Sequence, residues 1–195
     1  MELGRTLAQA RKLMERTVLP GETVVDATAG NGHDTLFLAE LIGPDGRVLA
    51  FDIQQEALDS TRIRLGNLSD RAELILDSHD RVADYAEGPV GGAMFNLGFL
   101  PNAGDRSVIT RPETTVRAVH DLLGLLKKGG LVTVCVYDGH EGGDRERDAL
   151  LAYARRLREA DVDVARYELI NQRGHPPFLV AFEKKKEFRE LLLLD

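Results

Sequence analysis

The residues best suited to chemistry form a turn near the start of the chain. Residues 26–35 read Asp-Ala-Thr-Ala-Gly-Asn-Gly-His-Asp-Thr, which places Gly30 and Gly32 two residues apart. A Gly-x-Gly turn before a helix lets the backbone approach a ligand closely and points helix N–H groups at it. The dinucleotide fingerprint Gly-x-Gly-x-x-Gly is incomplete, because Thr35 occupies the position of the third glycine. By itself, the turn is a weak signal for a nucleotide-like ligand.

Acidic and polar residues recur after the next two apolar segments. Asp52 comes 22 residues after Gly30, where a carboxylate can accept hydrogen bonds from both hydroxyls of a ribose. Asp77, Ser78 and His79 follow the third apolar segment, where an adenine would lie. Together these segment ends predict a nucleoside site. The alternative is that Asp52 and Asp77 only cap the helices that follow them.

A further polar group follows the fourth apolar segment, in the stretch Asn96-Leu97-Gly98-Phe99-Leu100-Pro101. In an open parallel sheet, ligands bind at the carboxyl ends of the strands, where the strand order reverses. The Asn96 carbonyl could accept a hydrogen bond from an amine substrate, and Phe99 could stack on a planar base. The alternatives are a turn-forming asparagine and a phenylalanine that packs in the core.

The elements that must position these residues follow from the hydrophobic pattern, in which short apolar segments alternate with amphipathic ones. The predicted strands are residues 23–28, 47–52, 73–76, 93–96, 131–137, 165–170 and 178–182. The predicted helices are residues 3–17, 34–41, 54–68, 112–128 and 144–160. The sequence contains no internal repeat and no low-complexity stretch.

Strands that alternate with helices predict parallel βαβ units, here in a single domain over residues 1–195. Only a turn at residues 174–177 joins the last two strands, so these must pair as a hairpin. We therefore predict an α/β, Rossmann-like fold. It has a seven-stranded, mostly parallel sheet with one antiparallel edge strand and helices on both faces. This arrangement is typical of class I methyltransferases rather than of dehydrogenases.

Composition narrows the class of protein. Of the 195 residues, 43% are hydrophobic and 29% are charged, as in ordinary globular proteins. No apolar run is long enough to cross a membrane and the N-terminus lacks a signal-peptide core, so we expect a cytoplasmic protein. The single cysteine, Cys135, excludes an internal disulfide, and no Cys/His cluster predicts a metal. A net charge of −7 argues against strong non-specific attraction to nucleic acid, although it is compatible with a local basic patch.

Six strings of the chain together resemble one known family: DATAGNGHDT, FDIQ, DSHD, FNLGFLP, YDGHEGG and NQRGHPPFL. The family is that of the YtqB/MnmM-type methyltransferases of bacteria, long labelled rRNA methylases, and the similarity spans residues 3–184. The resemblance implies an S-adenosylmethionine-dependent enzyme that N-methylates the aminomethyl group of 5-aminomethyl-2-thiouridine. That nucleoside occupies the wobble position, in the anticodon arm of tRNA. The resemblance also implies a homodimer.

Roles for individual residues follow from the same resemblance. It assigns Asn96, Leu97 and Gly98 to the catalytic loop. The cofactor-binding residues are then Asp26, Thr28, Gly30, Asn31, Gly32, His33, Asp34, Thr35, Asp52, Gln54, Ser78, His79 and Asn96. Residues 102–107 depart from the family pattern, although Arg106 retains a positive charge there. That departure affects the substrate loop and leaves the cofactor site intact.

Substrate contacts are expected at the same edge of the sheet, from Phe99, Pro101, Arg106, His140 and His175. His140 lies in a glycine-rich loop after the fifth strand. An unperturbed histidine titrates near neutral pH, so His140 and Asp34 are both candidate catalytic groups that could take a proton from the amine. The alternatives are a polar loop histidine at 140 and a plain turn around His175.

Two basic segments and the tail complete the candidates. The predicted helix 144–160 contains Arg145, Arg147, Arg155, Arg156 and Arg158, which form either a phosphate-contacting patch or a solvated face. The three lysines at 184–186 are expected to form a solvated end. The tail 187–195 contains four consecutive leucines, which we expect to be covered by this chain or by a second copy.

These observations favour an RNA methyltransferase that acts on tRNA. One alternative is an rRNA, small-molecule or protein methyltransferase on the same fold, and the acidic pI of 5.3 favours a substrate other than RNA. An alternative from another class is a nucleotide-binding oxidoreductase or a non-catalytic nucleotide sensor. Thr35 argues against that class, because it replaces the third glycine of the dinucleotide fingerprint.

Overall fold

The computed structural model describes residues 3–98, 111–139 and 142–187. The strands are β1 (Thr23–Asp26), β2 (Arg47–Asp52), β3 (Ala72–Leu76), β4 (Val90–Asn96), β5 (Leu126–Val136), β6 (Val162–Tyr167) and β7 (Phe178–Lys184). The α-helices are α1 (Thr6–Thr17), α2 (His33–Ile42), α3 (Gln55–Leu65), α4 (Val82–Tyr85), α5 (Pro112–Leu125) and α6 (Gly143–Arg155). Short 3-10 helices span Gly66–Arg71 and His79–Arg81.

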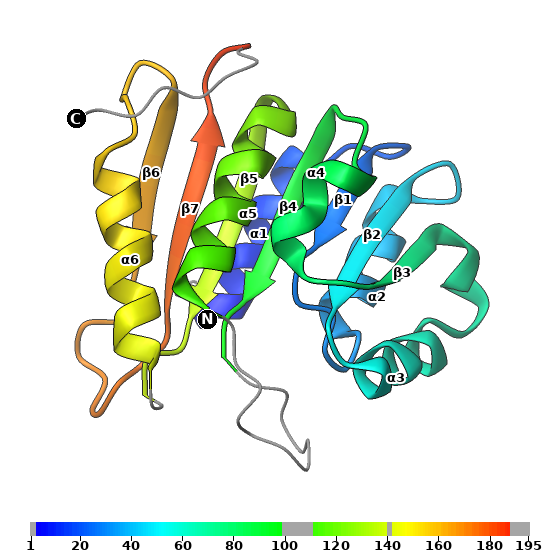
Figure 1. Cartoon of the computed structure of the whole chain (residues 1–195), viewed down its shortest axis with the longest axis horizontal. Coiled ribbons are helices and arrows are strands. Elements are labelled where there is room, and N and C mark those ends of the chain that lie inside the picture. The colour runs from blue at the N-terminus through cyan, green and yellow to red at the C-terminus, as the bar shows by residue number, and fades with distance from the viewer. Residues whose placement is uncertain (1–2, 99–110, 140–141, 188–195) are drawn as a thin grey trace.

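One sheet joins all seven strands in the order β3-β2-β1-β4-β5-β7-β6, as Figure 1 shows. Strands β1 to β5 run parallel to one another, and β7 runs antiparallel to both β5 and β6. The predicted seven-stranded, mostly parallel sheet with a terminal hairpin is therefore confirmed. The antiparallel strand lies one place in from the edge, because the hairpin folds back so that β7 pairs with β5 and leaves β6 outermost.

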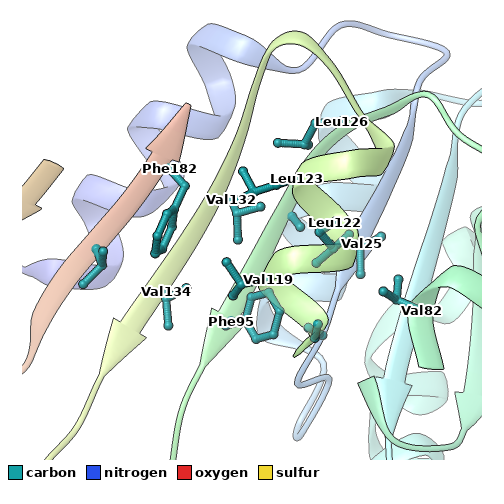
Figure 2. Packing of buried hydrophobic residues seen from close by; sticks show 14 of the residues in the cluster. Val25, Val82, Phe95, Val119, Leu122, Leu123, Leu126, Val132, Val134 and Phe182 are labelled. Atoms are coloured by element: carbon teal, nitrogen blue, oxygen red, sulfur yellow. The ribbon is translucent and has the colours of Figure 1, made fainter. Parts of the chain in front are cut away.

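Two hydrophobic cores cover the two faces of the sheet. On one face, α4, α5 and α6 pack against alternate residues of the central strands, including Val25, Phe95 and Val134 (Figure 2). On the other face, α1, α2 and α3 pack against the intervening residues, including Val24 and Met94. Successive side chains of a strand point to opposite faces, so strands buried on both sides are apolar throughout. That is why β1 and β4 read as continuous apolar runs in the sequence.

The helix predicted over residues 112–128 ends at Leu125, and β5 begins at Leu126, earlier than predicted. The Lys-Lys-Gly-Gly sequence at 127–130 suggests a helix end, yet these residues already belong to the strand. Two tertiary contacts decide the boundary. Leu126 pairs in register with Val90 of β4, and the Lys184 Nζ donates to the carbonyl oxygens of Gly124 and Leu126 at 2.9 and 2.7 Å.

Lys184 also corrects the expectation of a solvated end at 184–186. It is the last residue of β7 and only 1% exposed, whereas Lys185 and Lys186 are exposed. A buried ammonium group requires acceptors, and the last carbonyls of a helix carry the negative end of its dipole. Lys184 therefore caps the C-terminus of α5 from a neighbouring strand.

The other boundaries differ by a few residues. Helix α3 ends at Leu65 because Gly66 takes a left-handed φ of 53°, which stops the helix. Strand β6 spans Val162–Tyr167 instead of residues 165–170, and its burial pattern shows why. As an edge strand it buries fully only Val162, whereas Ile170, whose apolar character suggested a strand, is 90% exposed in the following turn.

Within the described ranges, no helix is long and apolar enough to cross a membrane. The leucines at 191–194, expected to be covered, lie outside the described residues.

We predict that Lys184→Met lowers the free energy of unfolding by about 1–3 kcal/mol, because two carbonyls at the end of α5 lose their donor. Urea denaturation measures the effect. Lys185→Met is the matched control, since its exposed side chain should contribute less than about 1 kcal/mol. Equal losses in the two variants would contradict the capping role of Lys184.

Candidate active site

The glycine turn lies between the end of β1 and the start of α2, and α3 holds it in place. Gly30 and Gly32 have left-handed φ angles of 52° and 78°. A Cβ on Gly32 would lie only 2.7 Å from the Thr61 Cα in α3, so only glycine fits there. The Thr61 hydroxyl donates to the Gly30 carbonyl at 3.1 Å, and the Arg64 Nε donates to the Asn31 carbonyl. Side chains of α3 therefore hold the backbone of the turn in its shape.

Asp26 anchors the turn from beneath. It is fully buried and accepts hydrogen bonds from the Thr28 N–H at 3.1 Å and the Thr35 hydroxyl at 2.6 Å. Burial, with a smaller contribution from the charge of Asp34, raises the pKa of Asp26 from 3.8 to about 7. Thr35 is fully buried as well. Asp26 and Thr35, both predicted to bind the cofactor, thus form a hydrogen bond with each other and support the turn.

Asp52 lies at the end of β2, beside the turn. Its carboxylate accepts hydrogen bonds from the N–H groups of Gly30 and Gln54, both at 2.9 Å. Burial raises the pKa of Asp52, while these backbone donors oppose the rise. The N-cap of α3 is Gln54 and that of the following 3-10 helix is Ser78, so neither Asp52 nor Asp77 occupies a cap position. The capping alternative is therefore not what the structure shows.

Two exposed apolar side chains flank Asp52, and sequence reasoning missed both. Ile53 is 56% exposed and Leu76 is 54% exposed, and Leu76 pairs in register with Asp52. The sequence pattern places Leu76 at the end of a predicted strand and gives Ile53 no role. Exposed apolar groups at the carboxyl ends of neighbouring strands offer a surface against which a flat base can pack.

His79, in the 3-10 helix after β3, carries a hydrogen-bond acceptor at the same edge of the sheet. Its Nδ1 lies 3.1 Å from the Ala27 carbonyl, which can only accept, so Nδ1 carries the proton. Burial lowers the pKa of His79, which keeps the ring neutral and leaves Nε2 as an acceptor. That Nε2 is buried and has no hydrogen-bond partner in the described part of the chain. A ligand with an N–H donor, such as the amino group of adenine, would satisfy it.

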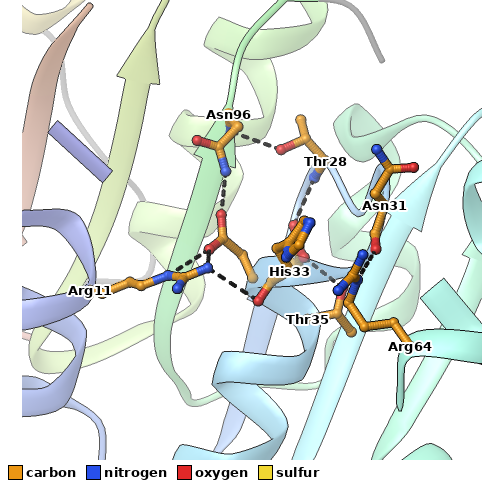
Figure 3. A network of polar contacts seen from close by, with 9 residues as sticks. Arg11, Thr28, Asn31, His33, Thr35, Arg64 and Asn96 are labelled. Carbon is orange, nitrogen blue, oxygen red and sulfur yellow. Dashed lines mark hydrogen bonds and ion pairs between the residues drawn. The ribbon is translucent and has the colours of Figure 1, made fainter. Parts of the chain in front are cut away.

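Asn96, at the end of β4, is held by two elements (Figure 3). Its backbone N–H donates to the Thr28 hydroxyl at 2.7 Å, and its side-chain Nδ2 donates to the Asp34 carboxylate. Asp34, in the first turn of α2, is only 5% exposed and forms an ion pair at 2.7 Å with Arg11 of α1. The Asn96 Oδ1 is buried and lacks a hydrogen-bond partner among the described residues. Nothing in the α1 sequence singled out Arg11.

The remaining candidates divide into described and undescribed residues. Leu97 is buried, and its N–H donates to the Cys135 carbonyl at 3.0 Å, while Gly98 has a φ of 129°. His175 is 73% exposed and its Nδ1 lies 3.9 Å from the Asp138 carboxylate, which follows β5. His33 is exposed, and Gln54 and Ser78 are half-buried. Phe99, Pro101, Arg106 and His140 lie outside the described residues.

The arrangement fits S-adenosylmethionine on observations of this chain alone. Asp52 offers carboxylate oxygens for hydroxyl groups, and His79 Nε2 is a buried acceptor without a partner among the described residues. Buried polar atoms are rarely left unpaired, so such an atom at the same sheet edge indicates a ligand with a matching donor. A metal site finds no such support, because the described residues contain no group of three or more potential ligands.

Comparisons with known proteins agree with this geometry. A family model described as “Putative rRNA methylase” matches residues 48–183. The crystal structure of a “putative rRNA-methylase” from Clostridium thermocellum is 43% identical, covers 93% of this chain and 98% of its own, and superposes with a TM-score of 0.91. A “putative methyltransferase” from Streptococcus mutans, solved in complex with SAH, is 38% identical, covers 93% of this chain and 99% of its own, and has a TM-score of 0.85.

A curated relative from Arabidopsis thaliana is the chloroplastic tRNA (mnm(5)s(2)U34)-methyltransferase. It is 32% identical over 188 residues, which cover 90% of this chain and 68% of the relative. Fold and site together define a class I, Rossmann-like methyltransferase that uses S-adenosylmethionine. Within that class, the chain belongs to the rRNA methylase family, a family of RNA methyltransferases.

We predict that Asp52→Ala weakens the binding of S-adenosylhomocysteine by about 1.5–3 kcal/mol, the range for charge-assisted hydrogen bonds. Isothermal titration calorimetry measures the affinity. Asp59→Ala is the matched control, because Asp59 is an exposed acid on the neighbouring helix α3. Unchanged affinity in Asp52→Ala would remove Asp52 from the site.

Asp26 makes the stability of the protein depend on pH. Below pH 4 the carboxyl is protonated in both the folded and the unfolded chain. Between pH 4 and about 7 the unfolded chain loses its proton while the folded chain retains it, so stability falls as pH rises. We predict that Asp26→Asn becomes more stable relative to the unmodified protein as pH rises from 4.5 to 7.5. Urea denaturation at both pH values tests this, and a constant difference would contradict it.

Proposed function

We propose that this enzyme transfers a methyl group to the nitrogen of 5-aminomethyl-2-thiouridine at the wobble position of tRNA. The observation that carries the proposal is the buried Asn96 Oδ1, which has no hydrogen-bond partner among the described residues and requires a donor such as an N–H of the substrate. A ring carbon or a deprotonated oxygen offers no such donor. The Arabidopsis relative, named for this wobble modification, supports the same chemistry.

The residues of the chain have little covalent chemistry to perform. S-adenosylmethionine, when bound, supplies a methyl carbon that its sulfonium already activates. An amine must be neutral to attack, and Asn96 Oδ1 can hold one of its hydrogens while leaving the nitrogen lone pair available. Asn96 itself is fixed through Thr28 and Asp34.

Of the two expected proton acceptors, Asp34 has both carboxylate oxygens engaged. One accepts from Arg11 and the other from the Asn96 amide. To take the proton of the amine, Asp34 would have to give up one of these hydrogen bonds. We therefore assign Asp34 to orientation, and water or His140 to proton removal.

Mass spectrometry of nucleosides tests the substrate directly. A tRNA that carries 5-aminomethyl-2-thiouridine without the methyl group should gain one methyl group when incubated with enzyme and S-adenosylmethionine. The controls are tRNA without the aminomethyl group, ribosomal RNA and buffer alone. Methylation of ribosomal RNA in place of tRNA would favour the alternative that the family label suggests, and would overturn the wobble assignment.

We predict that Asn96→Ala lowers kcat by about tenfold or more, the loss expected when one hydrogen bond to the reacting group is removed. Its affinity for S-adenosylhomocysteine should change by less than about twofold. Turnover assays measure kcat, and calorimetry measures the affinity for S-adenosylhomocysteine. Equal losses of turnover and of cofactor affinity would show that Asn96 serves the cofactor instead of the amine.

The five arginines of the predicted helix 144–160 do not form a single patch. Helix α6 has 13 residues and is therefore about 20 Å long. Arg145 lies in its first turn, near the carboxyl ends of β4 and β5, whereas Arg155 and Arg156 lie at the opposite end (Figure 1). Arg147 is paired with Asp138 and Asp148. Of these five arginines, Arg145 is therefore the one near the site that forms no ion pair with another described residue.

Two further exposed arginines lie at the same edge as Arg145. Arg5 directly precedes α1, and the next residue, Thr6, donates to the Pro177 carbonyl in the turn between β6 and β7. Arg173 lies in that turn. None of these three arginines forms an ion pair with another described residue. We propose that they contact RNA phosphates, which leaves the overall acidic surface irrelevant to docking.

We predict that Arg145→Ala combined with Arg173→Ala weakens tRNA binding and lowers the salt slope of log K by about 2, one unit per phosphate contact. Arg155→Ala with Arg156→Ala is the matched control of equal charge at the far edge. Binding isotherms from 50 to 250 mM salt measure both pairs. If the far-edge pair weakens binding instead, RNA docks along the outer end of α6.

The homodimer and the cytoplasmic location stay part of this proposal. A symmetric dimer is the commonest soluble assembly and would combine basic groups from two subunits around one anticodon arm. Light scattering should then give a mass of twice 21.5 kDa. A mass of 21.5 kDa at micromolar concentration would show that one copy binds its RNA alone.

A further inference from the structure

Helix α1 contacts the active site through the side chain of Arg11. The guanidinium of Arg11 donates to the Asp34 carboxylate and to the His33 carbonyl, both in the first turn of α2. We propose that Arg11 is a positioning residue, which orients the Asn96 amide through Asp34 so that Oδ1 faces the substrate. The proposal rests on the proposed function only in taking the Asn96 Oδ1 as the atom that receives the amine.

The guanidinium of Arg11 is held on three sides. Its Nε and Nη2 donate to the same oxygen of Asp34 at 3.0 and 2.7 Å, and Nη2 also donates to the His33 carbonyl at 3.2 Å. Its Cζ lies 5.1 Å from the centre of the Phe37 ring. Two donors on one carboxylate oxygen leave the other oxygen for a single further partner. That partner is the Asn96 amide (Figure 3).

The direction of the Asn96 amide follows from this arrangement. An asparagine side chain can present either its NH2 group or its oxygen to a neighbour, and the two orientations differ by a half-turn. An ionised carboxylate only accepts, so it selects the NH2 group. Asp34 thereby forces Oδ1 to the opposite side, where it is buried and lacks a hydrogen-bond partner in the described part of the chain. An amide without this constraint would turn to satisfy its own oxygen.

A purely structural role for Arg11 does not account for these contacts. Helix α1 is already attached to the sheet by Ala10 and Met14, which are fully buried, and by the hydrogen bond from Thr6 to Pro177. At its C-terminal end, the Lys127 Nζ donates to the Thr17 carbonyl at 2.9 Å. The bonds of Arg11 run instead to the turn that carries Asp34. A lysine could supply the charge, but it lacks the planar pair of donors, Nε and Nη2, that meet one oxygen of Asp34.

The test compares Arg11→Gln and Arg11→Lys with Lys12→Gln, an exposed cation one residue further along α1. We expect Arg11→Gln to lower kcat about tenfold, with KM for S-adenosylmethionine and the affinity for S-adenosylhomocysteine within twofold. Arg11→Lys should recover part of kcat, and Lys12→Gln should behave as the unmodified protein. Loss of kcat that tracks a lowered Tm in both Arg11 variants would overturn the proposal.

A double-mutant cycle tests whether Arg11 acts through Asp34. Asp34→Asn should lower kcat as much as Arg11→Gln does, and the double variant should be no slower than either single variant. Losses that multiply in the double variant would show that Arg11 acts independently and would overturn the proposal. If Arg11→Gln fails to fold, the same cycle with Arg11→Lys gives the answer.

A readout without turnover separates this inference from the choice of substrate. In the protein alone, the side-chain NH2 signals of Asn96 should be protected from solvent exchange in nuclear magnetic resonance spectra. Arg11→Gln should remove that protection, whereas Lys12→Gln should retain it. This outcome holds whichever RNA is methylated, so a failed tRNA assay would leave it intact. Unchanged protection in Arg11→Gln would show that Asp34 orients Asn96 without help from α1.

Discussion

The hydrogen bond from the Asn96 N–H to the Thr28 hydroxyl joins the ends of β4 and β1 at 2.7 Å, and the site depends on it. From β1 the chain passes to β2 on one side, whereas β4 pairs on the other side. The next α-helix after β1 is α2, on one face of the sheet, and the next after β4 is α5, on the other face. In open sheets this reversal of strand order marks the ligand crevice at the carboxyl edge. Thr28 keeps the two strand ends in register at that edge. The polar groups at the ends of β1 and β2 thus stay aligned with Asn96 at the end of β4.

Helices from one face of the sheet fix the two halves of the site. Helix α3 supports the glycine turn through Thr61 and Arg64, and α1 reaches Asp34 through Arg11. Both helices belong to the same hydrophobic core, which buries Ala10, Met14, Leu58 and Leu65. Helices α5 and α6 belong to the core on the other face. The described contacts that fix the turn and Asp34 therefore come from α1 and α3.

Two carboxylates lie close together beneath the turn, and the structure treats them differently. Asp34 is neutralised by the ion pair with Arg11 and remains a hydrogen-bond acceptor. Asp26 forms no ion pair with another described residue, and burial raises its pKa to about 7 instead. A pKa raised in this way lets Asp26 keep its proton to higher pH, which reduces the repulsion between two buried carboxylates.

The sequence by itself determined the sheet, the hairpin and the polar residues that follow the parallel strands. Strand periodicity, the glycine turn and Asp52 are local features, and parallel strands must bring their carboxyl ends to one edge. The tertiary structure alone decided what those residues do. Arg11 is one of several cations on an amphipathic helix until α1 packs beside α2, and Lys184 reads as a surface residue until β7 pairs with β5. Similarly, Asp26 became a support of the turn because burial paired it with Thr35. Contacts between distant segments are set by packing, and no local pattern in the chain records them.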